Sequence, residues 1–174
     1  RTQQILDFGR QAILRRQDID LVPFVENLRE QLQRTLPANI RLVLECQAHS
    51  LEVRGDPDRL RQAVINLALN ARDAMPGGGT LRITLGTGRA EGQCDACGQP
   101  ADGDWVQLTV TDTGIGISDA IRPHIFEPFF TTRSPLGTGL GLSQVFGIVR
   151  QHDGHIRVAS RAGAGSSFTL YLPP

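Results

Sequence analysis

Two groups of glycines bracket one loop of the chain and constrain its fold more than any other feature. The stretch from residue 112 to residue 143 reads DTGIGISDAIRPHIFEPFFTTRSPLGTGLGLS, with glycines near both ends. Glycine lets the backbone adopt positive φ and lets a bulky ligand approach the main chain. A helix that begins after Gly139 and Gly141 would direct unpaired N–H groups toward this loop, where phosphate oxygens bind favourably. These residues therefore predict a nucleotide-binding site.

Size and charge narrow the class of protein. The chain has 174 residues, of which 40% are hydrophobic, enough for one domain with a full core. Its 18 basic and 18 acidic residues cancel, so the overall charge does not indicate a nucleic acid or an anionic membrane as partner. No apolar run approaches the roughly 18 residues that span a bilayer, and the first residues do not resemble a signal peptide. We expect a cytoplasmic domain without direct membrane contact, whose parent protein can still be membrane-tethered.

Hydrophobic periodicity predicts the helices. Residues 1–17 have the apolar spacing of the end of an amphipathic helix. Asp20 is expected to cap a second helix over residues 21–36. A long helix starts near Pro57 and ends before Pro76, and a last helix is expected over residues 139–152.

Alternating and β-branched runs predict the strands. Residues 40–45 and 51–54 are expected to form a hairpin. Four further strands are predicted over residues 80–85, 105–111, 155–160 and 166–172. With about six strands and three core helices, the fold class is α/β, a mixed sheet covered by helices on one face.

Two asparagines lie four positions apart in the long helix, so Asn66 and Asn70 project from the same side. Asparagine is unfavourable inside a helix because its amide competes for backbone hydrogen bonds. The pair therefore either caps or bridges neighbouring strands, or it binds a ligand. An amide oxygen is a hard ligand suited to Mg²⁺, which commonly shares phosphate oxygens with its protein ligands. Asn70 is the candidate metal ligand, with Asn66 beside it.

Asp112 follows a predicted strand and precedes two glycines. It is either an ordinary turn aspartate or a buried acceptor for the exocyclic amine of adenine, with Gly114 and Gly116 giving room for the base. Glycine patterns match by chance often enough that D-x-G-x-G alone leaves both interpretations open.

Three cysteines, Cys46, Cys94 and Cys97, do not suit a secreted disulfide framework because their number is odd. Cys94 and Cys97 form CDAC within a glycine-rich segment. A C-x-x-C pair can be half of a zinc site, but the sequence shows no second pair, and redox C-x-x-C motifs normally open a helix. A plain loop insertion is the favoured interpretation; a zinc half-site and a redox pair stay open.

The order and spacing of five motifs then point to a family. They are NLALNARDAM at 66–75, DTGIGI at 112–117, FEPFF at 126–130, GTGLGL at 137–142 and GSSF at 165–168. Together they resemble the asparagine box, first glycine box, phenylalanine box, second glycine box and closing strand of sensor histidine kinases. The resemblance covers about residues 20–174. It implies a Bergerat-type two-layer sandwich with a flexible ATP lid, shared with DNA gyrase B, MutL-type mismatch repair proteins and a heat-shock chaperone.

The resemblance also implies residue roles. Asn70 would hold Mg²⁺ against the ATP phosphates and Asn66 would support the metal or phosphate shell, both as catalytic residues. Asp112 would recognise adenine, helped through water by Ser166. Glycines and amides of the second glycine box would cradle the phosphates, namely Gly137, Thr138, Gly139, Leu140, Gly141 and Leu142. The implied nucleotide-binding set also contains Asp73, Gly114, Gly116, Ile117, Thr131, Thr132 and Arg133, and the implied lid anchors are Phe126, Phe129 and Phe130.

Arg133 departs from the family pattern, in which many relatives have lysine after the paired threonines. Arginine still neutralises phosphate, so Arg133 is kept as a lid contact.

The implied activity needs a part that this chain does not show. A phosphoaccepting histidine lies on a helical hairpin, typically followed by an acidic residue, and none of His49, His124, His152 and His155 has such surroundings. We interpret residues 1–19 as the end of that dimerisation hairpin with its linker, and residues 20–174 as the catalytic ATP-binding domain. The domain would transfer the γ-phosphoryl group of ATP to the hairpin histidine, for relay to a response-regulator aspartate.

Three alternatives share these motifs. A gyrase-like ATPase activates water with a glutamate four residues before the metal asparagine, where this chain has Asn66, whose amide is no base. A serine kinase of the anti-sigma-factor type shares the fold, but the helical lead-in argues against it. A non-catalytic ATP-sensing module is disfavoured by the intact metal and glycine motifs.

Overall fold

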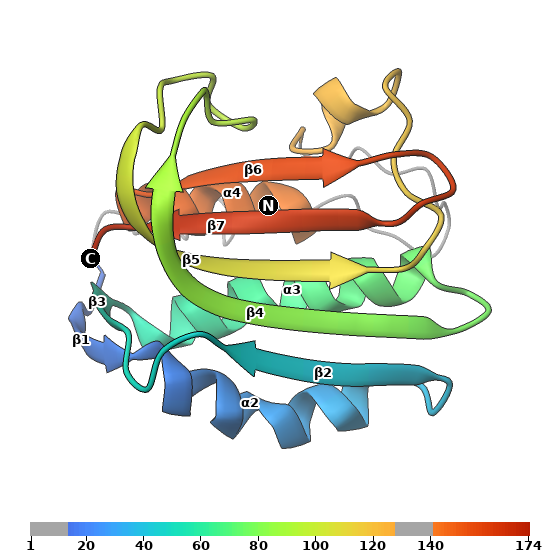
Figure 1. Ribbon diagram of the computed structural model, residues 1–174, viewed down its shortest axis with the longest axis horizontal. Coiled ribbons are helices and arrows are strands. Elements are labelled where there is room, and N and C mark those ends of the chain that lie inside the picture. The colour runs from blue at the N-terminus through green and yellow to red at the C-terminus, as the bar shows by residue number, and fades with distance from the viewer. Residues whose placement is uncertain (1–13, 128–140) are drawn as a thin grey trace, which may run out of the picture.

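A mixed five-stranded sheet forms one layer of the computed structural model, which describes residues 14–127 and 141–174. The strand order is β2 (Ile40–Cys46), β4 (Gly79–Ala90), β5 (Gly103–Asp112), β7 (Ser166–Leu172) and β6 (His155–Ser160). β2 runs parallel to β4, and the other neighbours are antiparallel. The sheet faces the viewer in Figure 1, with α3 (Pro57–Ala74) and α4 (Gly141–Gln151) behind it. The predicted two-layer α/β sandwich is confirmed.

The helices begin where their capping residues lie. Asp20 accepts a 3.1 Å hydrogen bond from the Val22 N–H and starts α2 (Leu21–Thr35), as predicted. Asp56 caps α3 in the same way, through the Asp58 N–H at 3.0 Å. Apolar residues that recur at three- and four-residue steps along α3 are buried, namely Leu60, Val64, Leu67 and Ala71. No helix within residues 14–127 and 141–174 is long and apolar enough to cross a membrane.

The predicted hairpin of residues 40–45 and 51–54 is wrong. β3 (Glu52–Gly55) pairs antiparallel with β1 (Gln17–Asp20), whereas β2 pairs with β4. The Asp20 carboxylate accepts hydrogen bonds from the Leu51 N–H at 3.0 Å and from the Ser50 hydroxyl at 2.9 Å. These bonds hold β3 beside β1 instead of β2.

β1 was not predicted. Residues 14–16 have no regular structure and Gln17 begins β1, so the helix expected over residues 1–17 does not extend to its end. The rest of that predicted helix lies outside the described residues. Within the described ranges there are seven strands, because β1 and β3 form a small second sheet.

The two faces of the main sheet differ in polarity. Leu108 and Val110 of β5 are buried on the side that the helices cover. On the other side, hydroxyl groups pair across β5 and β7, Thr109 with Thr169 at 3.1 Å and Thr111 with Ser167 at 2.9 Å. Side chains alternate along a strand, so Asp112 lies on the same side as Val110, toward the helices. The end of β5 therefore directs a carboxylate into the space between the two layers.

Candidate nucleotide-binding site

Asp112 and Ser166 lie directly opposite each other on β5 and β7. Both are buried, with 4% and 6% of their surface exposed. One carboxylate oxygen of Asp112, Oδ1, accepts a 2.9 Å hydrogen bond from the Gly114 N–H, which forms a turn. A carboxylate has about four lone-pair sites, so a turn role and an adenine-binding role are compatible.

A serine that the sequence analysis did not identify orients Ser166. Ser160 of β6 accepts a 2.7 Å bond from the Ile117 N–H and donates its hydroxyl hydrogen to the Gly165 carbonyl at 3.1 Å. The Ser160 and Ser166 hydroxyl oxygens are 2.8 Å apart. Because a hydroxyl has one hydrogen, Ser166 must donate in this pair. Its oxygen is thereby left as an acceptor beside Asp112.

The glycines of the first glycine box meet protein backbone. A Cβ atom at Gly114 would lie 2.2 Å from the carbonyl oxygen of Ala74, at the end of α3. Gly116 has φ +73°, and its Cβ would lie 2.0 Å from the Arg161 carbonyl oxygen. The Ile115 N–H also bonds the Ala74 carbonyl at 2.9 Å. These glycines therefore let the first glycine box pack against α3 and the β6–β7 turn. This packing is a second reason for glycine at both positions, in addition to the predicted room for the adenine base.

Asn66 joins α3 to the first turn of α4. It is buried, and its Oδ1 accepts a 2.8 Å bond from Gln62 Nε2. Its Nδ2 donates to Gln144 Oε1 at 3.0 Å and to the Gly141 carbonyl at 3.3 Å. The Asn66 side chain therefore bridges α3 and α4, and its role beside the metal or phosphate stays a prediction. Gln62 and Gln144 were not identified from the sequence. Gln62 is one helical turn before Asn66, but only the approach of Gln144, 78 positions away, shows that the three amides form a bridge.

Asn70 lies one turn beyond Asn66 and is half-buried. Within the described ranges, no hydrogen bond involves its side-chain amide. Asp73, also half-buried, accepts hydrogen bonds from Nε and Nη2 of Arg72, both at 3.3 Å. The Asn70 amide oxygen and the nearby Asp73 carboxylate are hard oxygen donors, which is the chemistry that Mg²⁺ requires.

Gly141 and Leu142 form the start of α4, whose first N–H groups have no partner within the helix. Phe126 packs against the core, and its ring lies 6.3 Å from that of Phe146 in α4. The remaining predicted residues of the lid and second glycine box lie outside the described residues: Phe129, Phe130, Thr131, Thr132, Arg133, Gly137, Thr138, Gly139 and Leu140.

The four histidines lie outside α2, α3 and α4. His49 falls between β2 and β3, and His124 closes the short helix η1 (Arg122–His124), where it pairs with Glu127 at 2.9 Å. His152 is buried after α4, and His155 begins β6.

Fold and candidate site together define the class, an α/β sandwich whose central strand directs a buried carboxylate into the space between sheet and helices. Residues 55–174 match the family described as histidine kinase-, DNA gyrase B-, and HSP90-like ATPase, and the chain belongs to that family. The predicted Bergerat-type fold and ATP-binding class are thereby confirmed.

Curated relatives and solved structures similar to this chain are sensor kinases. The sensor kinase CckA of Brucella abortus (strain 2308) is 40% identical over 176 residues, which cover 98% of this chain and 18% of CckA. The mycobacterial sensor histidine kinase MprB superposes with a TM-score of 0.71 at 28% identity, over 91% of this chain and 97% of that one. Full-length ShkA in complex with AMPPNP gives a TM-score of 0.76 at 25% identity, over 97% of this chain and 34% of that one. This chain thus spans less than a fifth of the length of CckA.

Proposed function

We propose that this chain is the catalytic and ATP-binding part of a sensor histidine kinase. It positions the γ-phosphoryl group of ATP for attack by a histidine on a dimerisation hairpin, and a response-regulator aspartate then receives the phosphoryl group. The names of the relatives support this proposal, as does the chain's 18% share of the length of CckA.

The observation that carries the proposal is that Asn66 has an amide side chain whose oxygen and nitrogen both form hydrogen bonds within the protein. A gyrase-like ATPase needs a base at this position to activate water, and an amide is none. The Asn66 oxygen and nitrogen are both engaged, with Gln62 on one side and with Gln144 and Gly141 on the other. The site therefore favours a nucleophile that another domain supplies.

Adenine recognition would rest on the end of β5. The Asp112 carboxylate would accept a hydrogen bond from the exocyclic amine, and the Ser166 oxygen would accept one from a bridging water. Both groups are buried and on adjacent strands, so they are held rigidly at hydrogen-bonding positions.

Phosphate binding would rest on α4 and the end of α3. The N–H groups of Gly141 and Leu142 would orient phosphate oxygens at the positive end of the helix dipole. Asn70, with Asp73 nearby, would hold Mg²⁺, which neutralises phosphate charge when it is bound. Because phosphoryl transfer has a loose transition state, such positioning and neutralisation supply most of the catalysis. The lid residues Thr131, Thr132, Arg133 and Thr138 stay predictions.

The test is phosphoryl transfer in trans. The chain is mixed with γ-labelled ATP, Mg²⁺ and a separately produced hairpin domain that carries a phosphoacceptor histidine. We expect acid-labile phosphohistidine on the hairpin, and Asn70→Ala should reduce its rate by roughly 100-fold. Asn27→Ala, an exposed position on α2, is the matched control and should leave the rate unchanged.

Two results would contradict the proposal. Rapid release of labelled phosphate without a hairpin, with no further change in Asn66→Glu, would favour an ATPase. ATP binding without transfer to any of several hairpins would favour the non-catalytic sensor.

A further inference from the structure

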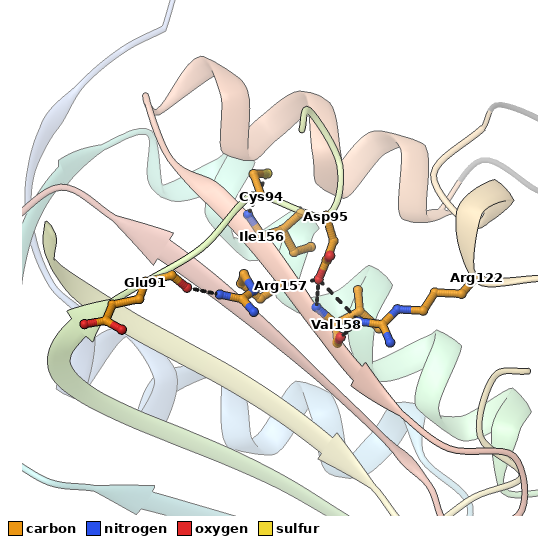
Figure 2. A network of polar contacts seen from close by, with 7 residues as sticks. All are labelled: Glu91, Cys94, Asp95, Arg122, Ile156, Arg157 and Val158. Carbon is orange, nitrogen blue, oxygen red and sulfur yellow. Dashed lines mark hydrogen bonds and ion pairs between the residues drawn. The ribbon is translucent and has the colours of Figure 1, made fainter. Parts of the chain in front are cut away.

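The CDAC segment covers an exposed edge of the main sheet. β6 is the outer strand of the sheet, and the segment between β4 and β5 lies along it (Figure 2). The Asp95 N–H donates to the Ile156 carbonyl at 2.8 Å, and the Ile156 N–H donates to Cys94 Sγ at 3.3 Å. The Val158 N–H donates to Asp95 Oδ2 at 2.6 Å. The segment therefore satisfies backbone groups that an edge strand would otherwise present to other chains.

Ion pairs fix the segment in place. Asp95 Oδ2 lies 3.6 Å from Arg122 Nη2 and 3.9 Å from Arg157 Nε. Arg122 also donates to the Val158 carbonyl, and Arg157 to the Glu91 carbonyl (Figure 2). The position of Asp95, next to Cys94, relative to β6 is thus fixed by these contacts.

This arrangement brings a histidine to the cysteine pair. The potential ligand atoms of Cys94, Cys97 and His155 all lie within 4.8 Å of one another. Cys97 Sγ is 3.5 Å from His155 Nδ1. In a tetrahedral site with usual Zn–S and Zn–N bond lengths, a sulfur and a nitrogen ligand lie about 3.6 Å apart. In the metal-free chain this contact is a hydrogen bond, and its length already suits two ligands that share one metal ion.

The turn around the cysteines directs N–H groups at sulfur. The Gly98 N–H bonds the Cys94 carbonyl at 2.9 Å, and Gly98 has φ +76°, which closes a tight turn. Backbone N–H groups of Ile156, Cys97 and Ala96 form hydrogen bonds with the Cys94 sulfur. N–H donors of this kind also stabilise a metal-bound thiolate.

Neighbouring side chains orient His155. Its ring meets the Trp105 ring edge-on, with centroids 5.4 Å apart and an interplanar angle of 86°. Trp105 is itself held by a 2.8 Å bond from its Nε1 to the Ala101 carbonyl. Arg150 Nη1 lies 3.8 Å from Cys97 Sγ and places a positive charge beside that sulfur. The three ligand residues are therefore held before any metal binds.

We propose that Cys94, Cys97 and His155 bind one Zn²⁺ ion, with a water molecule in the fourth position. Two thiolates and an imidazole are the soft and intermediate ligands that select Zn²⁺ over Mg²⁺ or Ca²⁺. On binding, each thiol releases its proton to solvent, and the two thiolate charges cancel the charge of the metal. The ion would join the β4–β5 insertion to β6 from outside the nucleotide site.

The first experiment is metal analysis of the 174-residue chain, purified under reducing conditions without chelator. We expect about one equivalent of Zn²⁺ per chain, and expect Cys97→Ser and His155→Gln to lose it. Cys46→Ser is the matched control, because Cys46 is an exposed thiol on β2, and it should retain the metal. In competition titrations, the two ligand variants should bind Zn²⁺ at least about 100-fold more weakly.

Co²⁺ substitution gives a second readout. The wild-type chain and Cys46→Ser should show the visible absorption of tetrahedral Co²⁺ and a thiolate-to-cobalt charge-transfer band. In Cys97→Ser, the charge-transfer band should lose intensity. Circular dichroism and ATP binding establish that each variant is folded. The proposal is overturned if the reduced wild-type chain takes up no Zn²⁺, if Cys97→Ser and His155→Gln bind it as tightly as wild type, or if a Cys94–Cys97 disulfide persists under reductant.

Discussion

His152 Nε2 accepts a 3.0 Å hydrogen bond from the backbone N–H of Asp56, which joins the end of α4 to the start of α3. The other ring nitrogen, Nδ1, lies 2.7 Å from the Ile148 carbonyl and must donate to it. His152 is thus held as the neutral tautomer with the proton on Nδ1. The ring also packs against Gly55, where a Cβ atom would lie 2.8 Å from His152 Cδ2.

The state of His152 predicts how stability depends on pH. Burial lowers the pKa of His152, and Arg16 lowers it further, against the Ile148 hydrogen bond and the charges of Asp56 and Asp153. Below the ordinary histidine pKa of about 6.5, the unfolded chain binds a proton that the folded chain does not. His152 therefore contributes its full stabilisation above the unfolded-state pKa of about 6.5. As the pH falls from that value toward and through the lower folded-state pKa, the free energy of unfolding decreases.

Urea unfolding at a series of pH values from about 5 to 7 measures this effect. His152→Gln has an amide oxygen that can accept from the Asp56 N–H and cannot titrate, so its stability should change less over that range. An equally steep pH dependence in this variant would show that other groups are responsible.

Asp112→Asn tests adenine recognition without breaking the turn. The asparagine oxygen can still accept from the Gly114 N–H, but the charge that would strengthen the bond to the adenine amine is lost. We expect the Kd for ATP to rise about 10- to 100-fold, as for a lost charged hydrogen bond. Calorimetry measures this, with Asp104→Asn as the control, since Asp104 lies exposed at the other end of β5. If the Kd for ATP is unchanged in Asp112→Asn, the Asp112 carboxylate stabilises the turn and does not recognise adenine.

Gly114→Ala should disturb the first glycine box. The added Cβ would meet the Ala74 carbonyl oxygen at 2.2 Å and its carbon at 2.6 Å, so the backbone of the box must move away from α3. We expect a loss of about 1–3 kcal/mol in the free energy of unfolding, together with weaker ATP binding. At Gly77 no atom lies within 4 Å of a built Cβ, and Gly77→Ala serves as the control. Equal stability of the two variants in urea unfolding would contradict the close packing.

Asn66→Ala removes the bridge between α3 and α4. The substitution leaves Gln62 and Gln144 without their partner, and the Gly141 carbonyl without its donor. We expect the free energy of unfolding to fall by about 1–3 kcal/mol. Thermal unfolding in comparison with the exposed Asn27→Ala measures the loss, and a wild-type-like transition would refute the structural role of the bridge.

Local signals accounted for most of the secondary structure. The cap at Asp20, the start of α3 near Pro57 and the strand that ends at Asp112 were predicted because each depends on neighbouring residues only. The partner of β3 was predicted wrongly, and β1 was missed. Their pairing joins residues 17–20 to residues 52–55, and a short polar strand such as QDID has no periodicity that reveals it.

Some residues of the candidate site were likewise identified from local motifs, and others became visible only in the structure. Asn70, Asp112 and Ser166 were identified from motifs, and their roles in binding nucleotide stay predictions. Ser160 and Gln144 were missed because they contact residues far away in the chain, Ile117 and Asn66. Gln62 lies only four residues before Asn66, but its role became visible only with the bridge to Gln144. The reason that Gly114 and Gly116 have no side chain also became visible only where the Ala74 and Arg161 carbonyls approach them.

The sequence by itself determined the class of this protein, since glycine spacing, helix caps and the positions of carboxylate and amide groups are properties of short segments. Only the tertiary structure decided which distant segments meet: β2 beside β4, Asn66 beside Gln144, and His155 beside Cys97. Such contacts depend on how the whole chain closes around one core. A side chain 58 positions away leaves no mark on the local pattern of a C-x-x-C pair, yet it supplies the third ligand of the proposed zinc site.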